Sequence, residues 1–483
     1  MLSFGTAALA TRPLTTAFSN NRRSRKPNIV FILVDDLGYS DLGCYGHPWH
    51  ETPHLDTLAR EGMTFTNAYA PAPICSASRA SILTGRSPAR LNFEFVTKPE
   101  PGRQKTSPQA PLRTPPFTLD LPLEEQTIPE YLNEAGYSTA FFGKWHLNKH
   151  HKGYLGWSPT HGPRQQGFQH AEEDFGSHPY GYEKGKIPVV KEKGKIPRDS
   201  LTERAVNFLK RKHEKPFFLM LSHFYVHTPV KPSCQWLSDK YQSKVPAESP
   251  NRSRRVAYGA FVEMLDDYIG RLLSALDETG LRDNTLVVFT SDNGGHPEFT
   301  SNKPLRGSKW NLYEGGIREP FLARWPGVIR KGSICDTPVI GYDLLPTFAE
   351  IAGKTIPTEG IDGISLVPLL RNPTKRLNRD LYWHFPYYHP EKGFAKALKD
   401  IGIDDFAVSQ TRPHSAIRRG HYKLLYFYED KHIELYDLEK DPGEQNDLSQ
   451  SKLQIAKLLN ETLQQTLKRV HARFPEPTEG DRP

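Results

Sequence analysis

The chain has 483 residues, 37% of them hydrophobic and 24% charged, which is enough for a large buried core and more than one domain. It has no apolar run long enough to span a bilayer, and its four scattered cysteines lack the Cys-x-x-Cys spacing of a zinc ribbon. The formal net charge of +8 favours polyanionic partners, but nucleic acid is not expected, because there is no basic arm, zinc-finger spacing or RNA-binding aromatic signature.

The first 26 residues are predicted to lie outside the folded domains. Residues 1–20 are mildly apolar and rich in Ala, Thr and Leu, with small residues at 8–10 like those before a signal-peptide cleavage site, but no basic stretch precedes them. A remnant export signal and a disordered tail both fit this composition. The first interpretation predicts a periplasmic or secreted protein.

Three continuous apolar segments, 28–34, 216–222 and 286–290, have the pattern of strands buried on both faces. Helical patterns alternate with them, and the clearest is 256–276, with its large apolar residues on one side. This alternation predicts a doubly wound α/β domain over residues 27–370, with a large mixed sheet flanked by helices.

The pattern changes near residue 371. Short aromatic-rich segments at 382–385, 421–428 and 432–437 are typical of strands, and residues 452–470 form one amphipathic helical segment. We therefore expect residues 371–483 to form a smaller α+β domain with an antiparallel sheet.

Two long segments, 92–123 and 149–198, are rich in proline, glycine and polar residues and show no period. The second is unusually long for a mere connection, so a binding loop and a solvated excursion both remain open for it.

Cys75 is predicted to lie in the first turn of a helix that ends at Gly85. The helix dipole and the unpaired N–H groups there would favour an anion or a thiolate. Arg79, four residues on, would share its face and could bind the same anion. The alternative is a buried structural cysteine beside a surface arginine.

Polar clusters follow several of the predicted strands, where ligands bind in an open α/β sheet. One cluster alone would be ordinary turn chemistry, but several together with the cysteine helix indicate a site. Hard oxygen ligands for calcium or magnesium come from Asp35, Asp36, Asp292 and Asn293. A tetrahedral anion could be surrounded by Arg79, Lys144, His146, His227 and Lys309, one histidine protonating a leaving oxygen.

The order of these motifs resembles the type I sulfatases of the alkaline phosphatase superfamily, over about residues 26–448. The matching motifs are Asp35-Asp36-Leu37-Gly38, Cys75-Ser76-Ala77-Ser78-Arg79 with Leu83-Thr84-Gly85-Arg86, Gly143-Lys144-Trp145-His146, His227-Thr228-Pro229, Ser291-Asp292-Asn293-Gly294, Lys309 before Leu312-Tyr313-Glu314-Gly315-Gly316, Glu434-Leu435-Tyr436-Asp437-Leu438, and Asp441-Pro442-Gly443-Glu444.

The resemblance implies that Cys75 is oxidised to formylglycine, whose hydrated aldehyde attacks sulfur, forms a covalent sulfated intermediate and then expels sulfate. It also implies a Ca²⁺ ion, Mg²⁺ being possible, held by the hydrated residue 75 together with Asp35, Asp36, Asp292 and Asn293. His227, assisted by Lys309, would protonate the leaving alcohol. Lys144 and His146 would flank nucleophile and sulfate, and Arg79 would stabilise the modified residue.

The signature departs from the family pattern at Ala77, where proline is usual. The form with alanine resembles signatures accepted by radical, oxygen-independent maturases. We therefore expect such a formylglycine-generating enzyme as a partner, in a bacterium.

Three functions compete. The first is removal of sulfate from a sulfated carbohydrate of the glycosaminoglycan or algal-polysaccharide type. The second is hydrolysis of phosphonate monoesters or phosphodiesters on the same fold, and the third is a non-enzymatic glycan-binding module that keeps Cys75 as a thiol. For the first, candidate sugar contacts in the second long segment are Trp157, Arg164, His170, His178 and Tyr180, among which Arg164 and His178 are the predicted substrate-binding residues.

Overall fold

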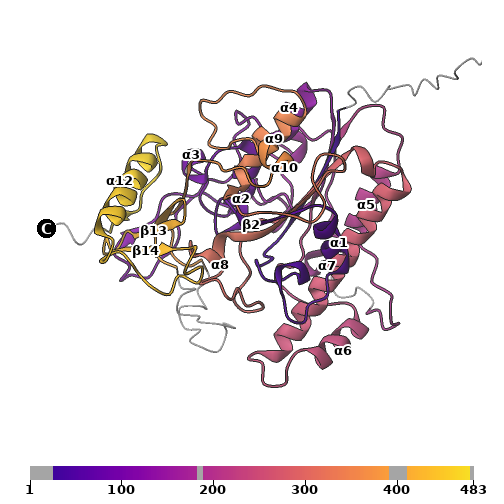
Figure 1. The fold of residues 1–483 in the computed structure, drawn as a ribbon, viewed down its shortest axis with the longest axis horizontal. Helices are drawn as coiled ribbons and strands as arrows, with labels where there is room; N and C mark the ends of the chain where they lie inside the picture. The colour runs from indigo at the N-terminus through magenta and orange to yellow at the C-terminus, as the bar shows by residue number, and fades with distance from the viewer. Residues whose placement is uncertain (1–25, 182–188, 391–410, 479–483) are drawn as a thin grey trace, which may run out of the picture.

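The computed structural model describes residues 26–181, 189–390 and 411–478 (Figure 1). The predicted tail, residues 1–26, lies outside the described residues except for its last one. No helix among the described segments is long and apolar enough to cross a membrane.

A mixed sheet of nine strands forms the centre of the described structure. Along it the order is β10-β2-β8-β7-β1-β6-β4-β5, and β9 pairs with β2. Strand β8 runs antiparallel to both of its neighbours, and the other pairs are parallel. The strands are β1 (Asn28–Val34), β2 (Met63–Tyr69), β4 (Ser138–Gly143), β5 (His170–Glu172), β6 (Phe217–Ser222), β7 (Thr285–Ser291), β8 (Arg318–Arg324), β9 (Ser333–Cys335) and β10 (Val339–Ile340).

Strand β1 shows why the apolar segments are strands. It pairs with β6 and β7 in parallel, and all seven of its residues are buried. Val30, Ile32 and Val34 join the apolar cluster on one face of the sheet. Ile29, Phe31 and Leu33 join the cluster on the other face, as the two-residue period of a strand requires. The predicted strands at 28–34, 216–222 and 286–290 are confirmed.

Helices cover both faces of this sheet (Figure 1). On one face lie α1 (Pro53–Glu61), α5 (Ser200–Leu209), α6 (Gln235–Lys244) and α7 (Arg252–Glu278). On the other lie α2 (Cys75–Thr84), α4 (Ile128–Glu134), α9 (Leu344–Ile351) and α10 (Val367–Arg371). The predicted α/β architecture is thus confirmed.

The long excursions contain more pairing than the sequence suggests. Residues 170–172 form the edge strand β5, and β3 (Leu112–Arg113) pairs with β15 (Glu476–Pro477) near the other end of the chain. Strands of two or three residues are too short to show a period, which is why they were not predicted.

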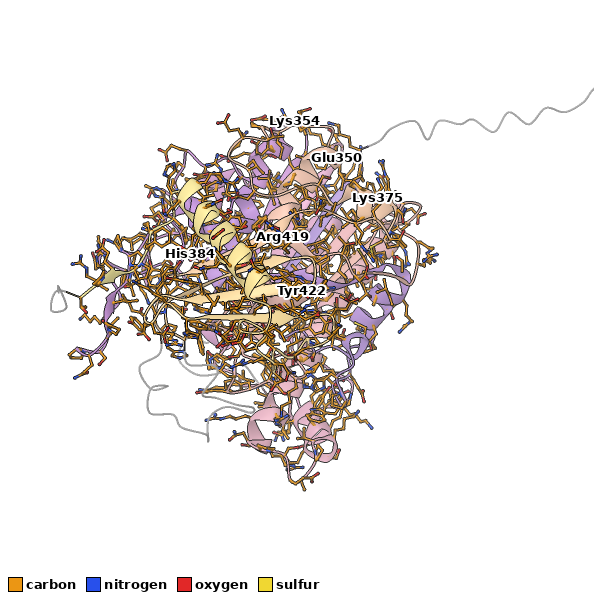
Figure 2. The ribbon with its side chains drawn as sticks, turned by 60° about the vertical axis from the view of Figure 1, so that its left-hand side comes forward. Glu350, Lys354, Lys375, His384, Arg419 and Tyr422 are labelled. Carbon is orange, nitrogen blue, oxygen red and sulfur yellow. The ribbon has the colours of Figure 1, made fainter. Side chains whose placement is uncertain are left out.

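A separate antiparallel sheet near the C-terminus consists of β11 (Asp380–Phe385), β12 (His414–Arg419), β13 (Tyr422–Phe427) and β14 (Ile433–Asp437), in that order. Helix α12 (Leu453–Arg469) lies across it, as Figure 2 shows, and buries Leu459, Leu463 and Leu467 there. The antiparallel sheet and its helix are confirmed. Strand β12 was not predicted, because its sequence, HSAIRR, is poor in strand-forming residues.

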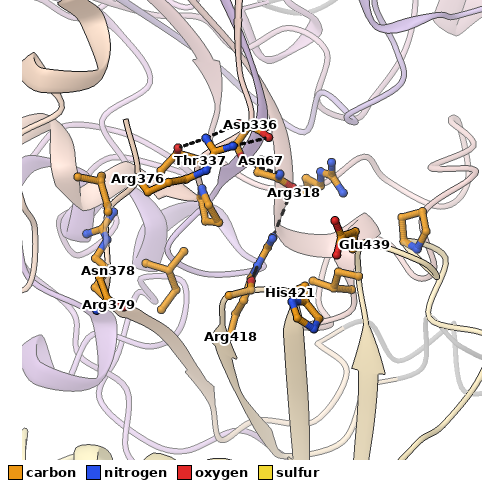
Figure 3. A pocket seen from close by; sticks show the side chains of 16 residues that line it. Asn67, Arg318, Asp336, Thr337, Arg376, Asn378, Arg379, Arg418, His421 and Glu439 are labelled. Carbon is orange, nitrogen blue, oxygen red and sulfur yellow. Dashed lines mark hydrogen bonds and ion pairs between the residues drawn. The ribbon is translucent and has the colours of Figure 1, made fainter. Parts of the chain in front are cut away.

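The two sheets meet at a polar seam. On β13, buried Lys423 lies 2.9 Å from Glu314 and 3.0 Å from Glu444, which are also buried. Beside it lies a cavity of ≈ 680 Å³ lined by both sheets, where Figure 3 shows Arg418 of β12 bonded to Asn67 of β2. The proposed domain division near residue 370 stays a prediction.

Candidate active site

The sheet order places the carboxyl ends of β7, β1, β6 and β4 side by side, and a polar cluster follows each of them. The structure therefore brings together residues that are far apart in the sequence, and each is at most 8% exposed. They are Asp35, Asp36, Lys144, His146, His227, Asp292 and Asn293, joined by Cys75 and Arg79 of α2 and by Lys309.

Helix α2 begins at Cys75, as predicted, and ends before Gly85, which adopts the left-handed conformation with φ 69°. Ile74, the residue before the helix, is extended and offers no side-chain cap. Burial raises the pKa of the Cys75 thiol above its ordinary value, although Lys144 and Lys309 lower it. An unmodified Cys75 is therefore held as a thiol, which argues against a thiolate nucleophile.

Arg79 binds the carboxylates and keeps one guanidinium nitrogen, Nη2, without a hydrogen-bond partner among the described residues, so its predicted contact with an anion stays a prediction. Its guanidinium donates to Asp292 Oδ2 at 2.8 Å, to the Lys144 carbonyl at 2.8 Å and to Ser222 Oγ at 2.5 Å. A further nitrogen lies 3.8 Å from Asp35 Oδ1. Arg79 thus ties α2 to the ends of β4, β6 and β7 and fixes the positions of two predicted metal ligands.

The four predicted ligand residues offer oxygen atoms of the kind a hard cation binds. Asp35 Oδ1 and Asn293 Oδ1 are buried and have no hydrogen-bond partner among the described residues. Ligand atoms of Asp35, Cys75 and Asp292 lie within 4.8 Å of one another. Because unpartnered buried oxygens are costly, the donor set fits a bound Ca²⁺ or Mg²⁺.

Asp36 is held from several sides. Its Oδ1 accepts from Asn293 Nδ2 at 2.7 Å, and its Oδ2 accepts from Lys309 Nζ at 2.7 Å. The residue has φ 61°, a left-handed conformation that costs about 1–3 kcal/mol outside glycine. These contacts offset that cost and aim the carboxylate into the site.

The two neighbouring carboxyl groups differ in their electrostatics. Burial raises the pKa of Asp35 to about 7, against the lowering effect of Lys144, whose Nζ lies 2.6 Å from Asp35 Oδ2. Burial also acts to raise the pKa of Asp36, but Lys309 and His227 hold it well below its ordinary value. A cation bound between them would favour the charged form of both.

His227 is positioned as a neutral imidazole. Burial, followed by the charge of Lys309, holds its pKa well below the ordinary value. Its Nδ1 lies 2.6 Å from the Thr228 carbonyl and 2.8 Å from the Tyr180 hydroxyl, so Nδ1 carries the proton that is donated to Thr228. Its Nε2 accepts from Lys309 Nζ at 3.2 Å.

His146 has two buried ring nitrogens that no described residue satisfies. Its backbone has φ 56°, the second left-handed residue of the site. Burial, then Lys144 and Arg79, hold its pKa well below the ordinary value, so it offers a neutral donor and acceptor.

The glycine after Asn293 is required by a close backbone approach. The N–H of Gly294 donates to the Gly316 carbonyl at 3.0 Å, and a Cβ at Gly294 would lie 2.1 Å from the Gly315 carbonyl oxygen. This contact joins the end of β7 to α8 (Glu314–Ile317). It explains why both motifs are rich in glycine.

The two predicted substrate-binding residues lie differently. His178 is buried, and its Nε2 lies 2.9 Å from the His227 carbonyl, so it supports the backbone of His227. Arg164 donates to the carbonyls of Ala171 at 2.8 Å and Gln169 at 3.4 Å, within its own loop. Substrate contact by either residue stays a prediction.

Sequence reasoning missed Ser222. Its buried hydroxyl accepts from Arg79 and donates to the Lys144 carbonyl at 2.7 Å, which makes it the link between α2 and the lysine segment. Ser222 could have been noticed in the sequence because it is the one polar residue of the apolar strand β6 and ends that strand.

Buried carboxylates beside two lysines and two neutral imidazoles are groups that suit an enzyme that cleaves esters of tetrahedral oxyacids. Comparison with known proteins specifies the class. A family model described as "Sulfatase" matches residues 27–354, and one described as "N-sulphoglucosamine sulphohydrolase, C-terminal" matches residues 308–473. The chain belongs to the sulfatase family and is a sulfuric ester hydrolase, which confirms the resemblance noted in its sequence.

Relatives align over most of the chain. Arylsulfatase A of Homo sapiens is 33% identical over 465 residues, covering 88% of this chain and 84% of the relative. N-acetylgalactosamine-6-sulfatase of Homo sapiens is 37% identical over 374 residues, covering 71% of this chain and 66% of the relative. A crystal structure determined in complex with k-i-k-neocarrahexaose has a TM-score of 0.69 and 27% identity, covering 92% of this chain and 93% of that one.

Proposed function

We propose that this enzyme removes sulfate from a sulfated carbohydrate, with formylglycine at position 75 and Ca²⁺ as its cofactors. The observation that carries the proposal is the cluster of buried, unpartnered ligand oxygens next to Cys75, with two lysines directly beside it. A carbohydrate substrate is supported by the relative named for N-acetylgalactosamine 6-sulfate and by the similar structure that contains a neocarrahexaose.

The ion would be held by Asp35, Asp36, Asp292 and Asn293 together with the oxidised side chain at position 75. When present, the cation polarises the sulfate oxygens and the oxidised residue supplies the nucleophile. Arg79 holds the carboxylates of Asp35 and Asp292 in position through its guanidinium group. A radical, oxygen-independent maturase is the proposed partner for the oxidation, since Ala77 stands where proline is usual.

The remaining side chains bind sulfate and move a proton. Lys144 and Lys309 are each 2.6–2.7 Å from one of the proposed ligand carboxylates, and their ammonium groups would bind the sulfate oxygens. His146 offers two free ring nitrogens to the same group. The pair His227 Nε2 and Lys309 Nζ, 3.2 Å apart, holds a proton where the sugar oxygen leaves.

The test compares two reactions on protein produced with a maturase. Hydrolysis of 4-nitrophenyl sulfate should exceed that of an aryl phosphonate monoester and should depend on Ca²⁺. A clear preference for the phosphonate would overturn the proposed reaction in favour of phosphonate hydrolysis. Binding of sulfated glycan without turnover, with Cys75 still a thiol, would support a binding module instead.

The proposed location is the periplasm or the outside of a bacterial cell, where sulfated polysaccharides are met. It is supported by the export-signal-like composition of residues 1–20. Fractionation of the producing cells, with detection of the protein in the periplasmic fraction, tests this point. Retention in the cytoplasm would contradict it.

A further inference from the structure

The two long excursions meet beside the candidate active site. Thr97, in the first excursion, donates its backbone N–H to Ser76 Oγ at 3.4 Å, and Ser76 is the neighbour of Cys75. In the second excursion, Lys149 pairs with Glu100 of the first at 3.4 Å, and the ring of His150 lies 6.3 Å from the ring of His146. Residues 97 and 98 therefore lie next to the first turn of α2, and residue 150 lies beside His146.

Lys98 is a cation without a counter-ion. Within the described residues its ammonium makes no ion pair or hydrogen bond, and it stands over the rings of Phe95 and Phe117 at 5.3 and 5.7 Å. The aromatic rings hold the stem in place but leave the charge unneutralised. Its closeness to the site follows from Phe95, the ring beneath it, which belongs to the same apolar cluster as Cys75.

His150 and Tyr154 add an uncharged hydrogen-bonding group and an aromatic surface. His150 Nε2 is buried and unpartnered in the described chain, so it can form a hydrogen bond with a hydroxyl group. Tyr154 is 50% exposed, a large value for an aromatic residue that stands edge-on to His146, His150 and Tyr180 at 5.2–5.8 Å.

These three side chains offer one interaction for each part of an anionic sugar. An unpaired ammonium binds a sulfate or carboxylate group, an imidazole nitrogen hydrogen-bonds to a hydroxyl, and a half-exposed ring packs against the apolar face of the sugar. We propose that Lys98, His150 and Tyr154 recognise a second anionic group on the substrate, next to the sulfate that is removed. The inference rests on the proposed carbohydrate sulfatase function and narrows its substrate class to sugars with at least two negative charges.

A purely structural Lys98, held by its aromatic neighbours, is the competing explanation. It predicts that loss of the ammonium changes stability without changing which sugar is preferred. The proposal predicts a change in preference, because a charge-assisted contact to substrate contributes about tenfold to a hundredfold in affinity.

The experiment measures kcat and KM, and competitive inhibition of 4-nitrophenyl sulfate hydrolysis, for pairs of sugars that carry one or two sulfates. N-acetylgalactosamine 6-sulfate with its 4,6-disulfate, and glucosamine 6-sulfate with its N,6-disulfate, are suitable pairs. In the wild type the disulfated member of at least one pair should bind about tenfold or more better. Lys98→Met should remove most of that preference through KM or the inhibition constant, and Lys98→Arg should restore part of it.

Lys149→Met is the matched control, because Lys149 is a neighbouring exposed lysine that already pairs with Glu100 at 3.4 Å. It should keep the preference for the second sulfate. Tyr154→Ala should weaken binding of both sugars, and Tyr154→Phe should not.

An unchanged preference in Lys98→Met, or no preference in the wild type for any pair, would overturn the inference. If the wild type hydrolyses no sulfate ester at all, the proposed function itself fails, so the two failures are distinguishable.

Discussion

The structure contains two buried lysine–carboxylate clusters, one in the candidate active site and one at the seam between the sheets, and they differ in how close a cation lies to each carboxylate oxygen. In the seam cluster, Lys423 serves both Glu314 and Glu444. Three of their carboxylate oxygens lie within 2.9 Å of a donor, and the fourth, Glu444 Oε1, makes no hydrogen bond among the described residues but lies 3.0 Å from Lys423 Nζ. In the site cluster, Lys144 serves Asp35, but Asp35 Oδ1 has no hydrogen-bond partner among the described residues. In the first cluster one lysine lies within 3.0 Å of both carboxylates and joins two sheets, whereas in the second Asp35 Oδ1 is left open to a ligand.

The seam cluster has a structural role, whereas the site cluster has a proposed functional one. Both clusters are almost fully removed from water, so burial alone does not identify a site. Each cluster contains a buried carboxylate oxygen without a hydrogen bond, and the two differ in the distance to a cation: Lys423 Nζ lies 3.0 Å from Glu444 Oε1, whereas Arg79 lies 3.8 Å from Asp35 Oδ1. The predictions below test this difference, beginning with the largest expected effect.

Substituting Asp292→Ala should abolish both bound calcium and sulfatase turnover. Asp292 Oδ2 is the anchor of Arg79, and its other oxygen accepts from the Asp36 backbone at 3.2 Å, so its loss disturbs two further ligand positions. Elemental analysis of the purified protein and turnover of 4-nitrophenyl sulfate are the measurements. Retained stoichiometric calcium in this variant would show that Asp292 is not a ligand.

Removing the metal from the wild type should also eliminate activity. Chelation leaves the unpartnered oxygens of Asp35 and Asn293 buried without a counter-charge, so thermal stability should fall together with turnover. Adding Ca²⁺ back should restore both. Full activity after exhaustive chelation, verified by elemental analysis, would contradict the assignment.

At the seam, Lys423→Met should lower the free energy of unfolding by about 3–5 kcal/mol, because it leaves buried carboxylates without their cation. Calcium content should stay unchanged. The triple variant Lys423→Met, Glu314→Gln, Glu444→Gln is the control and should recover part of the lost stability. Equal stability of wild type and Lys423→Met in denaturant titrations would mean that the seam cluster does not hold the two sheets together.

The smallest effect on stability is expected for the substitution Ala77→Pro. Ala77 is the third residue of α2, where the backbone N–H has no intrahelical acceptor, so proline is compatible with the helix. The side chain is fully buried, and two added methylenes should lower the free energy of unfolding by about 1–3 kcal/mol. Thermal melting should shift by only a few degrees. A variant that fails to fold would show that alanine is required for packing.

The sequence predicted the parts of this molecule that depend on local pattern. Continuous apolar runs identified β1, β6 and β7, and polar residues directly after them identified Asp35, His227 and Asp292 as neighbours. This works because the carboxyl ends of adjacent parallel strands meet at one edge.

What the sequence did not predict depends on contacts between distant, aperiodic segments. The orientation of Arg79 toward Asp292 is set by packing of α2 against strand ends that helical spacing cannot describe. Lys98 and Tyr154 come from excursions without any period, and β12 has weak strand propensity that its neighbours β11 and β13 override. Such features follow from tertiary structure alone.

The central claim is that residue 75 becomes the catalytic group, and it is tested most directly by the mass of the proteolytic peptide that contains it. Protein from a host with a formylglycine-generating enzyme should yield the peptide with an aldehyde in place of the thiol, in proportion to sulfatase turnover across preparations. An unmodified cysteine in fully active protein would contradict this account.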